Sequence, residues 1–433
     1  MVAIAQVPSR GRSLEPVPGH PADPAASAST ARVPRIALYS QGMVGFGHIR
    51  RNASIAQALR HSTLQPDVML IAEAWQAGAL LMPPGVDCVT LPALRRDADG
   101  GYNPRFFLDV SDGELVALRT RVIRSAMEVF HPDLLVVDCL PLGVAGELAP
   151  TLEFLKRRGK TRMVLGLRDV LYDPETVKRS WANQDNIDAI ENYYDSVWIY
   201  GDPTVFDPLR EYDLMESVGT KARHTGYLDQ RPRLEYAKAE AAPFVANLPS
   251  GKIALCLVGG GHDGGALAEA FLQSDLPLDT TGVLVTGPLM PWEERQHVRL
   301  EAEQRSQFRV LDFVHDPTPL IDRADRIIAM GGYNTVCEAL SFEKHALIVP
   351  RVNPEPEQWI RAQRLRDLGL VDVLHPGALS PAALTEWLAS DLGPPPASRS
   401  RIDFDGLTRI PAMVAELLNA PFTPTPGHMP LPL

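Results

Sequence analysis

The sequence has few cysteines, and none has the spacing of a zinc site or a dense disulfide framework. Four cysteines are spread over 433 residues, each beside an apolar segment: Cys88, Cys139, Cys256 and Cys337. Since no CxxC pair is present, a zinc ribbon and a disulfide-stapled secreted domain are both disfavoured. We expect buried, reduced thiols in a cytoplasmic protein.

Long apolar runs are also missing. No stretch reaches the roughly 18 uncharged apolar residues that a membrane-spanning helix needs. The best candidates, 68–81 and 134–148, are interrupted by Glu73, Asp138 and Glu147. The first 34 residues lack the basic head and apolar core of a signal peptide. We therefore expect no transmembrane segment, and any membrane contact would be peripheral.

Positive charge is in deficit. Lys and Arg total 42 against 53 Asp and Glu, a net charge of −11, so broad attraction to nucleic acid is not supported. No D-x-D element stands out as a metal site for a diphosphate. We expect neither a bound metal nor a cofactor.

Short apolar runs alternate with helical patterns from Arg35 onward, which is typical of parallel sheets flanked by helices. The expected strands of the first half are 35–40, 67–72, 87–91, 133–138, 162–167 and 196–200. Those of the second half are 252–261, 282–287, 308–314, 326–332 and 346–352. The pattern thins after Gly219, where we place a hinge. These runs predict an α/β fold with two tandem Rossmann-like, doubly wound domains that face a cleft.

The domain boundaries follow from the same pattern. We expect an N-terminal domain over 35–230 and a C-terminal domain over 250–395. Residues 403–420 have one more helical pattern, which could cross back onto the first domain. Residues 1–34, rich in Ala, Pro and Ser, predict a disordered leader, and residues 421–433 a proline-rich tail.

The most informative segment is "AMGGYNTVCEAL", residues 329–340. Ligands of open parallel sheets bind at the carboxyl ends of the strands, and here Gly331 and Gly332 end an expected strand. Asn334 is a good N-cap, and the helix that follows would present free backbone amides to an anion. Glu338 lies one turn deeper on the same helix face. It could accept hydrogen bonds from a ribose, or simply complement the helix dipole.

Two further polar groups follow the next expected strand. Glu357 and Gln358 begin a helix after Pro354 and Pro356. They could accept hydrogen bonds from several sugar hydroxyls, or form a solvated helix face.

The loop "GGGHDGG", Gly259 to Gly265, formally satisfies G-x-G-x-x-G. Gly260 and Gly261 in this loop could contact a phosphate or the acceptor. A plain tight turn is an alternative. A dinucleotide site is the weakest reading, because the next strand ends in Thr286 and Gly287 rather than in an acid.

In the first half, "SQGMVGFGH" places Gly45, Gly47 and His48 between the first strand and its helix. A histidine with an ordinary pKa of about 6.5 suits a base at neutral pH, although a lone histidine is usually structural. Asp169 is the rival base, at the end of another strand.

Three arginines occur near these candidate bases. Arg50 and Arg51 could hold an anionic acceptor or lie on a solvated helix face, and Arg168 lies beside Asp169 on the acceptor side.

With these motifs, the chain resembles the two-domain GT-B glycosyltransferases of family 28, which include the peptidoglycan N-acetylglucosaminyltransferase acting on lipid I. The resemblance extends over about 35–418 and is sharpest over 313–365. It implies the following donor contacts: Phe313 and Val314 with uracil, Gly332, Asn334 and Thr335 with diphosphate, Glu338 with ribose, and Glu357 and Gln358 with the sugar. His48 would match the histidine that ends the family's first glycine-rich loop, a loop with fewer glycines here.

The expected function is therefore inverting, metal-independent transfer of a hexose-type sugar from a nucleoside diphosphate sugar, with UDP as the nucleotide, to an acceptor hydroxyl. A UDP-sugar epimerase or hydrolase of the same fold is an alternative, as is a non-catalytic nucleotide-sugar-binding partner. An NAD-dependent oxidoreductase is the weakest rival.

Overall fold

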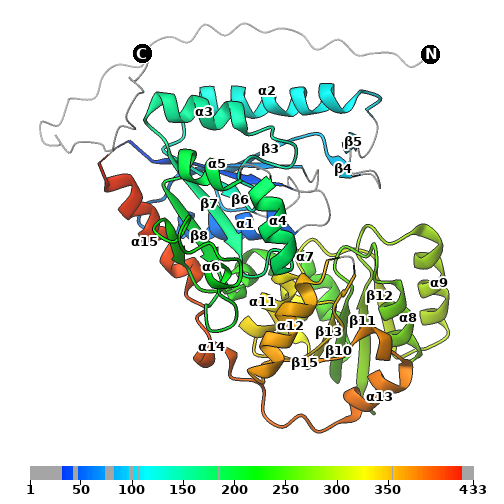
Figure 1. Ribbon diagram of the computed structural model, residues 1–433. Coiled ribbons are helices and arrows are strands. Elements are labelled where there is room, and N and C mark those ends of the chain that lie inside the picture. The colour runs from blue at the N-terminus through cyan, green and yellow to red at the C-terminus, as the bar shows by residue number, and fades with distance from the viewer. Residues whose placement is uncertain are drawn as a thin grey trace, which may run out of the picture. The chain divides into compact units, whose positions relative to one another are not determined.

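The computed structural model describes residues 32–41, 47–73, 82–96, 102–104, 108–183, 186–353 and 355–421. Two parallel sheets with flanking helices make up the fold (Figure 1). The predicted α/β architecture with two doubly wound units is confirmed. The predicted leader, apart from residues 32–34, and the predicted tail, apart from Pro421, lie outside the described residues.

The first sheet has seven parallel strands in the order β3-β2-β1-β6-β7-β8-β9. The strands are β1 (Arg35–Ser40), β2 (Asp67–Ala72), β3 (Val86–Thr90), β6 (Leu134–Asp138), β7 (Arg162–Arg168), β8 (Ser196–Tyr200) and β9 (Ala222–His224). A separate antiparallel pair joins β4 (Leu94–Arg96) to β5 (Tyr102–Pro104).

The second sheet has six parallel strands in the order β12-β11-β10-β13-β14-β15. The strands are β10 (Lys252–Leu257), β11 (Thr280–Val285), β12 (Phe308–Leu311), β13 (Arg326–Ala329), β14 (His345–Ile348) and β15 (Asp372–Val373).

Both faces of each sheet are buried, which explains the continuous apolar runs in the sequence. Along β1, Ile36 and Leu38 pack in one core with α1, while Ala37 and Tyr39 pack in another with α2 and α3. The helices of the first half are α1 (Gly47–His61), α2 (Asp112–Phe130), α3 (Ala149–Arg158), α4 (Pro174–Asn183), α5 (Asn186–Tyr193), α6 (Pro208–Glu211) and α7 (Leu234–Ala246). Those of the second half are α8 (Gly265–Gln273), α9 (Trp292–Glu303), α10 (Thr318–Arg323), α11 (Tyr333–Ser341), α12 (Glu357–Asp367), α13 (Pro381–Ala389), α14 (Ser398–Arg401) and α15 (Gly406–Asn419).

The last helix, α15, packs on α1 of the first half (Figure 1). Arg162, on β7, donates hydrogen bonds to the carbonyls of Leu417, Ala420 and Pro421 at the end of α15. The C-terminal part of the described chain is thereby tied to the first sheet. The domain boundaries expected from the sequence stay a prediction.

Strand order reverses once in each sheet, between β1 and β6 and between β10 and β13. In doubly wound sheets the loops on either side of such a point diverge and leave a crevice at the carboxyl ends of the strands. The loops after these four strands are therefore where a ligand site is expected.

A buried ion pair joins the two halves. Asp169, just after β7, accepts hydrogen bonds from Arg361 on α12, with Nη2 2.7 Å and Nε 3.0 Å from Oδ1. Both side chains are fully buried. Tyr227 donates to the other Asp169 oxygen at 2.8 Å, and the backbone amide of Val170 donates at 2.7 Å. The carboxylate is thus fully hydrogen-bonded inside the protein.

All four cysteines are free thiols, with Cys139, Cys256 and Cys337 buried and Cys88 half-buried. None of the helices in the described part of the chain has the length and apolar character to cross a bilayer.

We expect Arg361→Met to lower the free energy of unfolding by about 3–5 kcal/mol, because it leaves the buried Asp169 carboxylate without its cation. Urea denaturation measures this. The control is Arg364→Met on the same helix, where the partly exposed pair with Glu211 should contribute about 1 kcal/mol or less. Equal losses in the two variants would contradict a special role for the buried pair.

Candidate active site

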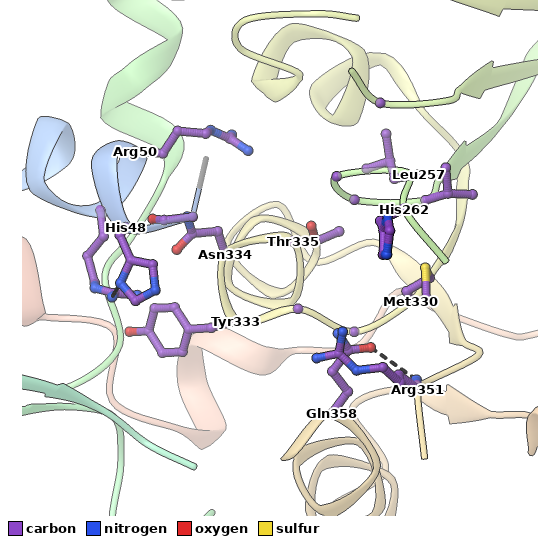
Figure 2. A pocket seen from close by; sticks show the side chains of 18 of the residues that line it. His48, Arg50, Leu257, His262, Met330, Tyr333, Asn334, Thr335, Arg351 and Gln358 are labelled. Carbon is purple, nitrogen blue, oxygen red and sulfur yellow. Dashed lines mark hydrogen bonds between the residues drawn. The ribbon is translucent and has the colours of Figure 1, made fainter. Parts of the chain in front are cut away.

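A cavity of about 390 Å³ lies at the carboxyl ends of both sheets. Gln41 and the start of α1 line it after β1, and Leu140 and Val144 after β6. From the second sheet, 258–260 and 330–335 line it after β10 and β13. The cavity is therefore formed at the two points where strand order reverses, as doubly wound topology requires. Figure 2 shows His48 and Arg50 on one side of it, with Thr335, His262 and Arg351 facing them.

His48 lies in the first turn of α1 and is 18% exposed. Its Nδ1 is 2.6 Å from Oδ2 of Asp138, which ends the neighbouring strand β6. Arg51 donates to both oxygens of the same carboxylate, at 2.7 and 2.6 Å. When Nδ1 carries the proton and donates to Asp138, the lone pair of His48 is on Nε2. The carboxylate thus fixes the tautomer and the ring orientation that a general base needs.

The electrostatics keep this histidine neutral. Burial, the largest influence, lowers the pKa of His48, Asp138 partly offsets this, and Arg51 and Arg168 lower it further. Burial alone would raise the pKa of Asp138, but Arg51 and His48 outweigh it and hold that pKa below its ordinary value. At neutral pH the pair is therefore an imidazole beside a carboxylate.

Asp169, the rival base in the sequence analysis, does not fit that role. It is fully buried, and its oxygens accept hydrogen bonds from Arg361, Tyr227 and Val170. Its function in this structure is the ion pair that joins the two halves.

The start of α11 differs from the prediction. The helix begins at Tyr333 with Gly332 as its N-cap, two residues before the expected cap Asn334. The positive φ of Gly331, 84°, turns the chain directly into the helix, and a Cβ there would lie 2.6 Å from Ile348. The amides of Tyr333, Asn334 and Thr335 have no intrahelical acceptor, and all three residues line the cavity. An anion-binding helix end is therefore present, as expected.

Asn334 also contacts the first half of the chain. Its side-chain amide donates to the carbonyl of Gly47 at 2.7 Å. In this conformation the backbone amide of Asn334, rather than its side chain, is available for the predicted contact with a diphosphate. Gly47 itself lines the cavity, as the acceptor-side prediction required, whereas Gly45 lies outside the described residues.

Glu338 is fully buried and ion-paired with Arg50. Arg50 also approaches Asp316, at 3.7 Å. These two side chains thus contact each other in this structure, and their expected roles, ribose contact for Glu338 and acceptor contact for Arg50, stay predictions. Oε2 of Glu338 has no hydrogen-bond partner in the described structure. Burial raises the pKa of Glu338 to about 7, against the opposing effect of Arg50.

Glu357 and Gln358 are buried in the first turn of α12 and line the cavity, as expected. Arg351, which follows β14, holds both. Its guanidinium donates to Glu357 at 3.3 Å, and its backbone amide donates to Gln358 at 3.0 Å (Figure 2). The pKa of Arg351 is raised, because Glu357, Asp263 and Glu355 outweigh the effect of burial.

The glycine loop after β10 divides into two parts. Gly259 and Gly260 line the cavity, where a backbone contact to a ligand is possible without side-chain interference. Gly261 instead fits a tight turn, since a Cβ there would lie 2.2 Å from the carbonyl oxygen of Thr286. Phe313 and Val314, the expected uracil contacts, line the cavity as well.

Asp138 and Arg351 were not among the site residues expected from the sequence. Asp138 was visible as the acid that ends the expected strand 133–138, but only the structure shows that this strand lies beside β1. Arg351 lies near the end of the expected strand 346–352. Among the described residues, no group of three or more His, Cys, Asp or Glu side chains is placed to hold a metal ion.

The buried Glu338 carboxylate predicts a pH dependence of stability. Its folded pKa of about 7 lies above its ordinary value of 4.5, so the native state binds a proton that the unfolded state releases. The free energy of unfolding should therefore fall as pH rises from about 4.5 through 7. Glu338→Gln should remove this slope, as measured by urea denaturation across pH 5–8. Glu355→Gln, at a half-exposed side chain, is the control. An unchanged slope in Glu338→Gln would contradict the prediction.

Comparison with known proteins agrees with this geometry. Residues 254–401 match the family model of the Glycosyltransferase family 28 C-terminal domain. A curated relative from Haemophilus influenzae (strain PittGG), UDP-N-acetylglucosamine--N-acetylmuramyl-(pentapeptide) pyrophosphoryl-undecaprenol N-acetylglucosamine transferase, is 27% identical over 90 residues. That match spans 21% of this chain and 26% of the relative.

Solved structures extend the likeness to both halves, as a matter of fold. The glycotransferase of kitacinnamycin superposes with a TM-score of 0.60 at 16% identity, covering 89% of this chain and 100% of that one. UDP-GlcNAc 2-epimerase from Neisseria meningitidis gives 0.58 at 13% identity, covering 89% and 99%. The resemblance seen in the sequence is thus confirmed: this chain has the GT-B fold, and its residues 254–401 match the glycosyltransferase family 28 C-terminal domain.

Proposed function

We propose that the protein is a glycosyltransferase that moves a hexose-type sugar from a UDP-sugar to an acceptor hydroxyl, with inversion at the anomeric carbon. One observation carries this proposal. The amide-rich start of α11 and His48, which is held by Asp138, line a single cavity and come from opposite sheets. A diphosphate at the first and a hydroxyl at the second would lie on either side of the sugar.

In this mechanism, Nε2 of His48 accepts the proton of the acceptor hydroxyl as its oxygen attacks the anomeric carbon. The bond to the diphosphate breaks, and the nucleoside diphosphate leaves with the electron pair. A single displacement of this kind inverts the configuration. Three further carboxylates line the cavity, those of Asp263, Glu355 and Glu357, and Arg351 pairs with each of them. Because an arginine holds them, they are better suited to accept hydrogen bonds from the donor sugar than to act as a nucleophile.

Charge on the leaving diphosphate would be met by the amides of 333–335. A preorganised donor of this kind typically contributes about 3–4 kcal/mol to lowering the barrier. We therefore propose that the transfer needs no metal ion and no cofactor beyond the nucleotide sugar. Phe313 and Val314, which line the same cavity, are the proposed uracil contacts. Free thiols fit a reducing compartment, and we propose a cytoplasmic location.

An epimerase is the second candidate, because a UDP-GlcNAc 2-epimerase shares the fold. The two functions differ in whether an acceptor is needed. Conversion of a UDP-sugar to its epimer by the protein alone would favour the epimerase. Sugar-dependent UDP release that an added acceptor stimulates would favour the transferase.

We expect Gly332→Val to weaken UDP binding at least tenfold without unfolding the protein. Gly332 lines the cavity, its φ is an ordinary −58°, and an added Cβ meets no atom within 4 Å. The new side chain would therefore occupy the space proposed for the diphosphate. Calorimetric titration with UDP measures the loss. Gly113→Val, also at an open position, is the control. Unchanged UDP affinity in Gly332→Val would contradict the assignment.

We expect His48→Ala and Asp138→Asn each to lower kcat by about 10²- to 10⁴-fold, because both remove the oriented base. Since the two groups act as a unit, the double variant should be little slower than the slower single variant. UDP release under saturating donor measures the rates, and UDP affinity serves as the control. Multiplicative losses in the double variant would show that the two side chains act independently.

A further inference from the structure

Four arginines line the cavity, and they differ in what neutralises them. Arg51 is paired with Asp138, Arg50 with Glu338, and Arg351 with Glu357. Arg168 forms no ion pair with any described residue. Its Nη2 donates one long hydrogen bond, to the carbonyl of Leu171 at 3.3 Å. Its Nε is buried without an acceptor.

Arg168 is placed on the side of the cavity that holds the proposed base. It ends β7, the strand that pairs with β6, and β6 ends in the Asp138 that holds His48. Burial lowers the pKa of His48 and raises that of Cys139, and the charge of Arg168 is close enough to both groups to act downward on each pKa. Arg168 therefore lies at the carboxyl end of the same sheet that positions the base, whereas α11 belongs to the other sheet.

The cavity wall formed by the first sheet fits an organic molecule with a polar and an apolar part. Gln41 is 7% exposed and lines the cavity, and its Oε1 has no hydrogen-bond partner. It can accept from a hydroxyl. Leu140, Val144 and Tyr172 line the cavity on the same sheet and offer apolar contact.

We propose that the acceptor is an anion: a hydroxyl compound whose carboxylate or phosphate is bound by Arg168, while its reacting hydroxyl lies at His48. This inference rests on the proposed glycosyl transfer and narrows its acceptor. A half-buried guanidinium without a counter-ion is energetically costly, and an oxyanion restores charge-assisted hydrogen bonds to it. The bound anionic group takes no part in making or breaking bonds, so the transfer step itself is unchanged.

Binding of the acceptor's anionic group to Arg168 would also change the pKa of His48. Arg168 lowers the proton affinity of His48 as long as its charge is not neutralised. An anion bound to Arg168 cancels part of this effect, so His48 becomes a stronger base once the acceptor is in place. A neutral alcohol would lack this advantage.

The test uses the full chain saturated with UDP and three pairs of probes that differ in charge. They are 4-hydroxybenzoate and its methyl ester, 12-hydroxydodecanoate and its methyl ester, and glucose 6-phosphate and glucose. Calorimetric titration gives Kd for each. The first two pairs report a carboxylate and the third a phosphate.

Four proteins are compared: wild type, Arg168→Gln, Arg168→Lys and the control Arg121→Gln, which changes an exposed residue of α2. We expect at least one anionic probe to bind the wild type about tenfold or more tightly than its neutral partner. This preference should vanish in Arg168→Gln, survive in part in Arg168→Lys, and stay unchanged in Arg121→Gln. The Kd of UDP should be the same in all four.

The contrary outcomes are distinct. Absence of a charge preference in all three pairs, or a preference that survives in Arg168→Gln, overturns the inference. Weakened UDP binding in Arg168→Gln also overturns it, because Arg168 would then hold the donor diphosphate. Failure of the wild type to bind UDP overturns the proposed function and this inference together, whereas UDP binding without a charge preference overturns the inference alone.

Discussion

The pair between Arg361 and Asp169 is the interaction on which the arrangement of the two halves depends. Each sheet supplies only one wall of the cavity, so a site exists only when the carboxyl ends of both sheets are held together. A fully buried guanidinium that donates to a fully buried carboxylate tolerates little displacement, because each charge is costly to bury without the other. The phenol of Tyr227 and the amide of Val170 complete the hydrogen bonding of the carboxylate. This contact therefore contributes geometry more than net stability.

Around that contact, the two sheets supply different chemistry. The first sheet provides side chains: the ends of β6 and β7 carry Asp138 and Arg168, and α1 begins with His48. The second half provides the backbone amides of the glycine loop after β10 and of the helix start after β13, together with side chains such as Arg351 and Glu357. Side chains can be exchanged without refolding a loop, whereas an amide-rich helix end is fixed by the fold. Substitutions of the side chains that line the cavity would therefore leave the anion-binding helix end in place.

Features set by neighbouring residues could be predicted from the sequence, whereas contacts between distant residues could not. The long strands were predictable, because burial on both faces leaves continuous apolar runs, whereas the three-residue β9 and the two-residue β15 are too short to show one. The glycines after β13 and the polar start of α12 are local motifs, so Gly332, Thr335 and Glu357 were expected at the site, and all three line the cavity. The N-cap was misplaced by two residues because Gly331 turns the chain earlier than Asn334 suggests. Contacts such as His48 with Asp138, 90 residues apart, need the strand order, which a single sequence does not specify.

The contact of Arg50, which lines the cavity, with the buried Glu338 has a consequence for any ligand that would use the Glu338 carboxylate. These side chains come from different halves and are 288 residues apart in the chain. A molecule that competes for the carboxylate must first displace the Arg50 guanidinium, so its apparent affinity is lowered to the extent that molecules with this contact open are rare. Because the contact joins α1 to α11, such a molecule would also remove one of the contacts that hold the two halves together.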